Sequence, residues 1–189
     1  MTLHLIDVSS VAPQAWRNGG GQTRELLVWP AIGTWQLRIS RADIDRNGAF
    51  SAFIGVTRWF AVLNGAGVSL QFGPTTHELR PGDAALNFDG AQAPDCHLMN
   101  GPTQDLNLMS IGGSSEMTLA HAGIAWNTQH TMRGLYATVA GHWQHGSKRS
   151  TVAAHHLLWD DAAAAGPWRF DPEPGCAGTA LWLGFTPQA

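Results

Sequence analysis

Short runs of apolar and β-branched residues, each closed by glycine, proline or asparagine, recur along almost the whole chain. Residues 34–40, "TWQLRIS", form one such run, and "RWFAVLNGAGVSLQFG" contains two runs separated by Asn64 and Gly65. Asn-Gly between apolar runs is a strong hairpin signal because both residues tolerate positive φ. Helical periodicity is weak, and the best candidate for a helix is the short alanine run at residues 162–165. The pattern therefore predicts an all-β protein with many short strands.

Composition agrees with this architecture and excludes several classes of function. Charged residues make up 13% of the 189 residues, about half the usual share, while 22 glycines and 10 prolines supply turns. The net charge is −3 and no basic patch is present, so nucleic acid is not an expected partner. No apolar run is long enough to cross a membrane, and the first ten residues lack the pattern of a secretory signal. Cys96 and Cys176 form no CxxC motif, which favours free thiols in the cytoplasm.

A looser segment divides the chain. Residues 112–123 include the sequence "GGSSE", and the strand-turn-strand pattern occurs both before and after this segment. We therefore expect residues 1–111 and residues 112–189 to form two β-rich halves, packed together as antiparallel sandwiches or barrels.

The spacing of two turns resembles the cupin barrel. "VLNGAGVSL" is followed by "ELRPGDAALNF", whereas metal-binding cupins carry a His-x-His…Glu cluster before the first turn and another histidine after the second. The corresponding positions here fall near Ala52, Ile54, Arg58 and Ala93, with His97 the nearest histidine. One histidine does not make a metal site, since zinc or iron needs about three protein ligands. The sequence therefore predicts no metal and no cofactor.

Arg58 suggests a different use of the barrel mouth. Its guanidinium would place a fixed positive charge there, and guanidinium groups suit bidentate capture of a carboxylate. The alternative is an ordinary surface arginine.

The histidines of the C-terminal half do not form a recognisable metal-binding pattern. His142 and His145 differ in strand parity, and the adjacent His155 and His156 point to opposite faces of a strand.

A series of motifs resembles the HutD/Ves family of cupin-like proteins. They are "WRNGGGQTRE", Arg-x-Ser-x-Ala from residue 38, "GAFSAFIGVTR", "FDGAQAPDCHL" and "GPTQDLNLM", in the family's order and spacing over residues 16–109. Three positions depart from the family pattern. Arg17 replaces a lysine, Leu37 replaces a tryptophan, and Thr57 replaces the aspartate common before the family arginine. Arg58 therefore needs another partner.

The resemblance implies a bicupin fold and a link to histidine utilisation. It implies a metal-free binding protein for a small carboxylate, such as formylglutamate or formiminoglutamate, in a regulatory role. No established reaction attaches to the family, which favours a binding protein over an enzyme. Two alternatives stay open. One is a metal-free isomerase or amide/imine hydrolase that uses Glu25 or Asp105 as acid/base, and the other is a stress-response protein that acts through partners. Association as a homodimer is also left open.

The candidate ligand-binding residues come from these motifs and from strand alternation. They are Trp16, Asn18, Gly19, Gly20, Gly21, Thr23, Glu25, Arg38, Ser40, Phe53, Arg58, Phe88, His97, Asp105 and Asn107. Alternation places Thr23 with Glu25, and Asp105 with Asn107, on shared strand faces. We expect Glu25 to pair with Arg38 or Arg58, or else to face solvent.

The glycine run and its neighbours allow two interpretations each. Three consecutive glycines either turn backbone N–H groups toward an anionic ligand or form a strand entry that needs positive φ. Trp16 is either a pocket wall or a core residue, and Asn18 either binds the ligand or closes an Asx-turn. Cys96 is expected to be a buried, inert thiol.

Overall fold

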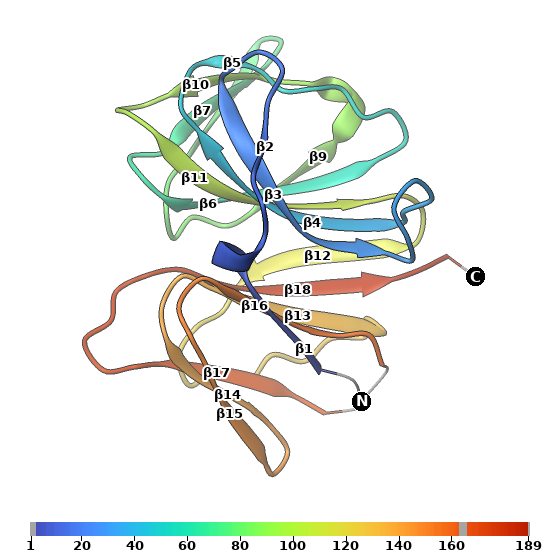
Figure 1. Ribbon diagram of the computed structural model, residues 1–189, viewed down its shortest axis with the longest axis vertical. Coiled ribbons are helices and arrows are strands. Elements are labelled where there is room, and N and C mark those ends of the chain that lie inside the picture. The colour runs from blue at the N-terminus through green and yellow to red at the C-terminus, as the bar shows by residue number, and fades with distance from the viewer. Residues whose placement is uncertain (1–2, 163–165, 189) are drawn as a thin grey trace. The chain divides into compact units, whose positions relative to one another are not determined.

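The computed structural model describes residues 3–162 and 166–188 and is built almost entirely of β-strands (Figure 1). In the described part of the chain the helical elements are two single 3₁₀ turns, η1 (Val8–Ser10) and η2 (Gly90–Gln92). The all-β prediction is confirmed. The alanine-run helix falls, apart from Ala162, outside the described residues. Across residues 3–162 and 166–188, no helix has the length and apolar character needed to span a membrane.

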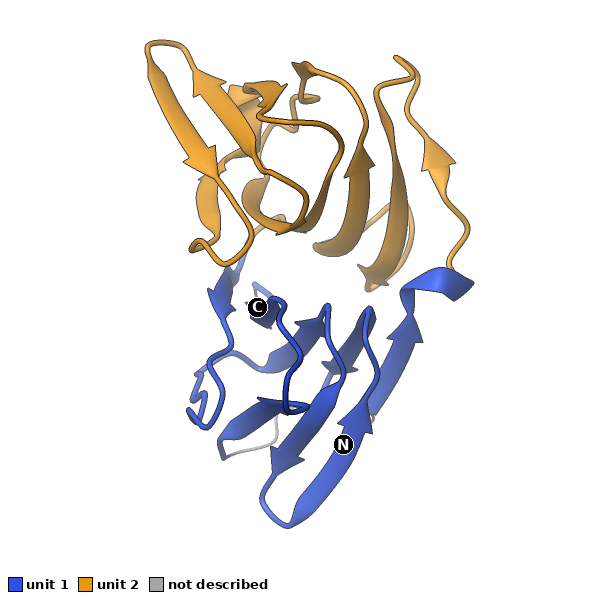
Figure 2. Ribbon diagram, turned by 90° about the vertical axis from the view of Figure 1, so that its left-hand side faces the viewer, with its two compact units in different colours: residues 1–10, 113–189 blue, residues 11–112 orange. Residues whose placement is uncertain are grey.

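The chain forms two compact units (Figure 2). One contains residues 11–112, and the other combines residues 1–10 with residues 113–189. Strand β1 (Leu3–Asp7) belongs to the second unit because it pairs with β16 (His156–Asp160), with Leu3 opposite Asp160. This differs from the expected halves, which assign residues 1–10 to the N-terminal half. A local hydrophobic pattern identifies a strand but not its distant partner.

The unit of residues 11–112 contains two antiparallel sheets. The larger has the order β2-β3-β4-β11-β6-β9. Its strands are β2 (Gln14–Ala15), β3 (Gly21–Trp29), β4 (Leu37–Ile44), β11 (Thr103–Ser110), β6 (Thr57–Asn64) and β9 (Leu86–Asp89). The smaller sheet has the order β5-β10-β7-β8. Its strands are β5 (Gly48–Ala49), β10 (Asp95–Leu98), β7 (Val68–Phe72) and β8 (Thr75–Leu79).

An apolar core joins these two sheets. It takes Ile44, Phe60 and Val62 from the larger sheet and Leu70 and Cys96 from the smaller one. These side chains alternate with residues of the opposite face along each strand, as expected for strands that bury one face in a sandwich.

The Asn64-Gly65 turn corrects one prediction. The sequence predicts a hairpin there, but β6 pairs with β11 and β9, while β7 pairs with β10 and β8. The turn therefore carries the chain from one sheet to the other. Gly65 has a φ of 95°, so the local conformation suits Asn-Gly, but tertiary pairing decides which strands are neighbours.

The second unit also contains two antiparallel sheets. The five-stranded sheet has the order β1-β16-β13-β18-β12, and the three-stranded sheet has the order β15-β14-β17. Their remaining strands are β12 (Ser114–Leu119), β13 (Met132–Ala137), β18 (Ala180–Thr186), β15 (Lys148–Val152), β14 (Gly141–His145) and β17 (Trp168–Pro172). The buried Trp143, Trp168 and Trp182 pack together in its core. These three tryptophans are therefore residues of the hydrophobic core.

Candidate functional site

A cavity of about 760 Å³ opens on the core-facing side of the larger sheet in residues 11–112. Most of the predicted site residues line it. They are Trp16, Asn18, Thr23, Arg38, Ser40, Phe53, Arg58, Asp105 and Asn107. The remaining lining residues were not predicted from the sequence, and they are Gln14, Ala15, Arg17, Ala42, Ala49, Phe50, Ser51 and Met109. Phe50 and Ser51 belong to the "GAFSAFIGVTR" motif, so that motif was the available signal for them.

Antiparallel register explains why the polar lining residues gather. Asn107 on β11 lies opposite Ser40 on β4, and Asp105 lies opposite Ala42 in the next row of that face. On the other side of β11, Met109 lies opposite Arg58 on β6. Residues that face each other across adjacent strands point to the same side of a sheet. The alternation predicted from sequence therefore places these side chains together.

A linked row of buried polar side chains crosses the floor of the cavity. Arg58 Nε donates a hydrogen bond to Asn107 Oδ1 at 2.8 Å, and Asn107 Nδ2 donates to Asp105 Oδ1. The exposed fractions are 7% for Arg58, 6% for Asn107 and 1% for Asp105. Asn107 thus connects the cation to the carboxyl group and is the partner that Arg58 needs in place of an aspartate at Thr57.

The Arg58 guanidinium is held between aromatic rings and keeps hydrogen-bonding capacity. Its central carbon lies 4.4 Å from the centre of the Phe50 ring and 5.5 Å from that of Phe88. Burial lowers the pKa of Arg58 to about 10, against the charge of Asp105, so the group stays cationic at neutral pH. Among residues 3–162 and 166–188 its side chain has one hydrogen-bond partner, Asn107, reached through Nε. The two Nη atoms can therefore hold a carboxylate.

Asp105 is the most deeply buried charged residue of the cavity lining. Burial raises the pKa of Asp105 to about 7, while the Arg58 charge and the Asn107 hydrogen bond oppose this rise. Its second oxygen, Oδ2, is buried and has no hydrogen-bond partner within the described part of the chain. The carboxyl group can therefore exchange a proton near neutral pH and can accept a hydrogen bond from a bound molecule.

Other contacts organise the wall of the cavity. Glu25 Oε2 lies 2.7 Å from Arg38 Nε, which confirms that Glu25 pairs with Arg38. Trp16 Nε1 donates a hydrogen bond to Thr23 Oγ1 at 2.7 Å, so this tryptophan lines the cavity with its ring held in place.

The glycine run lies beside the cavity but does not line it. A Cβ atom at Gly21 would meet the Asp43 carbonyl oxygen at 2.2 Å and the Trp16 ring at 3.1 Å, so close packing excludes any side chain. Gly19 has a φ of 68°, and Asn18 Oδ1 accepts a hydrogen bond from the Gly20 backbone N–H at 3.0 Å. Backbone geometry therefore explains the run, and Asn18 closes an Asx-turn while it also lines the cavity.

Three further predicted residues lie outside the cavity lining. Glu25 reaches it only through Arg38, and Phe88 packs on Arg58 from one side. His97 is exposed on β10, where the neighbouring Cys96 takes the buried face, so strand alternation directs the histidine away from the core. Over residues 3–162 and 166–188, no group of three His, Cys, Asp or Glu side chains is placed to hold a metal ion.

The two cysteines should differ in reactivity. Cys96 is buried, and its burial together with the charge of Asp105 raises the pKa of its thiol to about 12, whereas Cys176 is exposed. Because the thiolate is the reactive form, we expect iodoacetamide at pH 8 to modify Cys176 alone in the folded protein and both residues in denaturant. Peptide mass spectrometry identifies the modified residue, and rapid native labelling of Cys96 would contradict its buried position.

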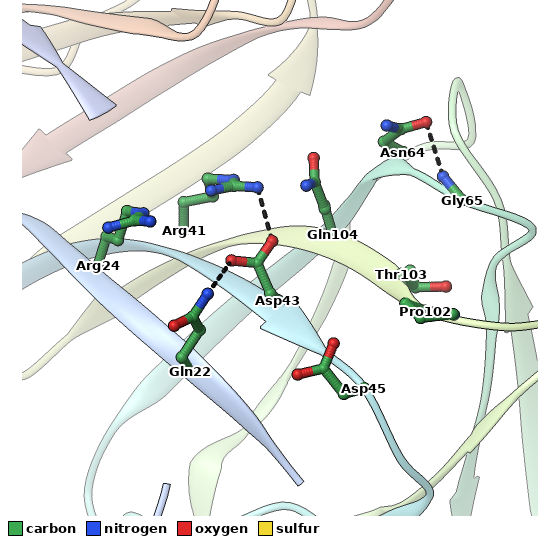
Figure 3. Close-up of a pocket in the computed structure, with 10 residues that line it drawn as sticks. All are labelled: Gln22, Arg24, Arg41, Asp43, Asp45, Asn64, Gly65, Pro102, Thr103 and Gln104. Carbon is green, nitrogen blue, oxygen red and sulfur yellow. Dashed lines mark hydrogen bonds and ion pairs between the residues drawn. The ribbon is translucent and has the colours of Figure 1, made fainter. Parts of the chain in front are cut away.

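A second cavity, of about 440 Å³, lies on the opposite face of the same sheet (Figure 3). Three of its four charged side chains, those of Arg24, Arg41 and Asp43, have hydrogen-bond or ion-pair partners among the described residues. Arg41 Nη2 lies 2.6 Å from Asp43 Oδ1, and Gln22 Nε2 donates to Asp43 Oδ2 at 3.0 Å. Arg24 Nη1 donates to the Val11 carbonyl oxygen at 2.8 Å. The first cavity is therefore the better candidate for a binding site.

Comparisons with known proteins agree with the motifs. The family model described as HutD matches residues 8–174. Protein Ves from Citrobacter koseri is 31% identical over 162 residues, which cover 84% of each chain. An uncharacterized 21.2 kDa protein in the hutC 3′ region of Pseudomonas putida is 36% identical over 110 residues, or 57% of each chain. The solved structure of HutD from Pseudomonas fluorescens SBW25 matches with a TM-score of 0.84 at 22% identity and covers 100% of both chains.

Proposed function

This chain belongs to the HutD family, and we propose that it binds a small carboxylate without a metal, in a regulatory role in histidine utilisation. One observation carries the proposal. The buried Arg58 guanidinium lines a cavity of about 760 Å³, and among the described residues its Nη atoms have no hydrogen-bond partner. The position of the Pseudomonas putida relative in the hutC 3′ region supports the choice of pathway.

The cavity suits an N-substituted glutamate such as formylglutamate or formiminoglutamate. Its volume lies within the range of roughly 300–1,000 Å³ usual for small-molecule sites. Arg58 can pair with one carboxylate of such a ligand in bidentate fashion, and Arg38 adds a second cation, shared with Glu25. Phe50, Phe53 and Met109 supply an apolar wall for the methylene groups between the polar ends.

One observation favours an enzyme as the second candidate. A carboxyl group with a pKa of about 7 inside a cavity is suited to general acid/base catalysis, and Asp105 is such a group. An isomerase or an amide/imine hydrolase would then use the same cavity. The two candidates differ in whether the ligand is released chemically unchanged.

Replacing Arg58 with alanine should weaken binding of the preferred ligand at least about thirtyfold. Truncating one member of a buried, hydrogen-bonded charge pair costs about 2 kcal/mol or more. Isothermal titration with formylglutamate, formiminoglutamate and glutamate measures the loss. The matched control is Arg80→Ala, because Arg80 is exposed, pairs with Glu78 and lies outside the cavity lining. Circular dichroism of each variant shows whether the fold is kept.

The same samples separate the candidate functions. Mass spectrometry of the ligand after incubation shows whether it has changed, and a changed ligand would select the enzyme. Absence of binding at millimolar concentrations of all three compounds would overturn the proposed function. Equal affinity of the wild type and Arg58→Ala would show that Arg58 does not contribute to ligand binding.

A further inference from the structure

Asp105 gives the cavity a second basis for ligand specificity, in addition to the binding of a carboxylate by Arg58. We propose that the ligand also carries a nitrogen-bound hydrogen that donates to Asp105 Oδ2, and that Asp105 makes the site prefer a cationic nitrogen over a neutral acylated one. This inference rests on the proposed function because it concerns the ligand of the same cavity.

The orientation of Asn107 leaves one oxygen of Asp105 for a ligand. Arg58 Nε can only donate, so the atom of Asn107 that faces it must be the oxygen, and the amide nitrogen of Asn107 then faces Asp105. Both ends of the amide are thereby occupied, and its donor goes to Oδ1. Oδ2 is buried without a donor from the described residues. Leaving a buried acceptor unsatisfied costs free energy, so an incoming N–H group gains by reaching it.

The charges around Asp105 favour a ligand that carries both a negative and a positive group. Arg58 on β6 faces it from one side, and Arg38 on β4 is paired with Glu25. Cys96 on β10 is neutral because its thiol pKa is about 12. Asp43 and Arg41 act on Asp105 from the far face of β4 and are paired with each other.

A carboxylate bound to Arg58 removes the cation that compensates ionised Asp105. A ligand that also carries a cationic nitrogen compensates Asp105 in turn, because the two opposite charges attract at short range. A ligand with a neutral amide leaves the ionised carboxyl group without a counter-charge. The site is therefore expected to separate amidinium-bearing carboxylates from their acylated analogues.

The preference should grow with pH because it needs ionised Asp105. With a pKa of about 7, the ionised fraction of this group rises from about a tenth at pH 6 to about nine-tenths at pH 8. The apparent affinity of a ligand scales with the fraction of protein in the competent state. The affinity for a cationic-nitrogen ligand, relative to a neutral one, should therefore rise about tenfold over this range.

Formiminoglutamate and formylglutamate test the inference because they share a skeleton and differ in the charge of the nitrogen group. Isothermal titration at pH 6, 7 and 8 gives the ratio of their affinities. We expect the ratio to rise about tenfold in the wild type and in Asp95→Asn, a matched carboxylate-to-amide change at an exposed residue of β10 outside the cavity lining. In Asp105→Asn the ratio should stay flat, because an amide does not ionise.

The outcomes separate this inference from the proposed function. A ratio that stays flat in the wild type, or that rises equally in Asp105→Asn, would overturn the inference, while binding that depends on Arg58 would still support the proposed function. Binding of neither compound would overturn both. The wild-type profile decides the matter by itself if Asp105→Asn does not fold.

Discussion

Replacing Gly21 with alanine is expected to lower the free energy of unfolding by about 3 kcal/mol or more, at the upper end of overpacking penalties. The added Cβ would lie 2.2 Å from the Asp43 carbonyl oxygen and 3.1 Å from the Trp16 ring. This carbonyl belongs to β4, which pairs with β3 so that Gly21 lies opposite Ile44. The steric clash can therefore be relieved only if the two strands move apart. Urea denaturation followed by tryptophan fluorescence measures the change.

The other two glycines of the run are the controls. Gly19→Ala should cost about 1 kcal/mol, because Gly19 has a positive φ but a Cβ there would meet open space. The atoms nearest to a Cβ at Gly20 belong to the Asn18 side chain, the first at 3.2 Å, so Gly20→Ala should cost less than Gly21→Ala. Equal stability of all three variants would contradict the close approach of strand β4 to Gly21.

The fold class and the face of each polar residue were predictable from sequence because both follow from local periodicity. Alternation alone places Asp105 and Asn107 on one face of β11, and it does the same for Arg38 and Ser40 on β4. Burial of that face in a sandwich then brings these residues into one cavity. The turn residues likewise mark where strands end.

Strand partnership and contacts across strands were not predictable in this way. The position of β1 beside β16 and the passage of the chain between sheets at Asn64-Gly65 both depend on tertiary pairing, which no local signal reports. Spacing from a turn predicts His97 as a site residue, whereas strand alternation along β10 directs its side chain outward. The link from Arg58 through Asn107 to Asp105 requires the register of β6 on β11.

Replacing Asp105 with asparagine should stabilise the unliganded protein at pH 8 by as much as about 4 kcal/mol. The pKa of Asp105 is raised from the ordinary 3.8 to about 7 in the folded state, and each unit corresponds to about 1.4 kcal/mol. Asparagine has nearly the same shape, keeps an oxygen that can accept the hydrogen bond from Asn107, and carries no charge to desolvate. Thermal or urea unfolding at several pH values measures the difference.

The sign of the pH dependence follows from proton binding. Between about pH 4 and pH 7 the folded protein holds the Asp105 proton and the unfolded chain does not, so the contribution of this group to stability falls as pH rises through that window. Above pH 7 both states are ionised and the contribution levels off. Wild type and Asp105→Asn should therefore have similar stability near pH 4 and diverge toward pH 8. Asp43→Asn, which breaks the ion pair with Arg41, should not reproduce this gain.

A gain of stability on removing a buried carboxyl group would indicate that the group serves binding rather than folding. Polar residues at functional sites are commonly held at a cost in stability, and their replacement stabilises the protein while it impairs function. Asp105→Asn should thus unfold at higher urea concentration at pH 8 and lose the pH-dependent preference between the two glutamate derivatives. Lower stability than wild type at pH 8 would instead show that ionised Asp105 supports the fold, through Asn107 and the charge of Arg58.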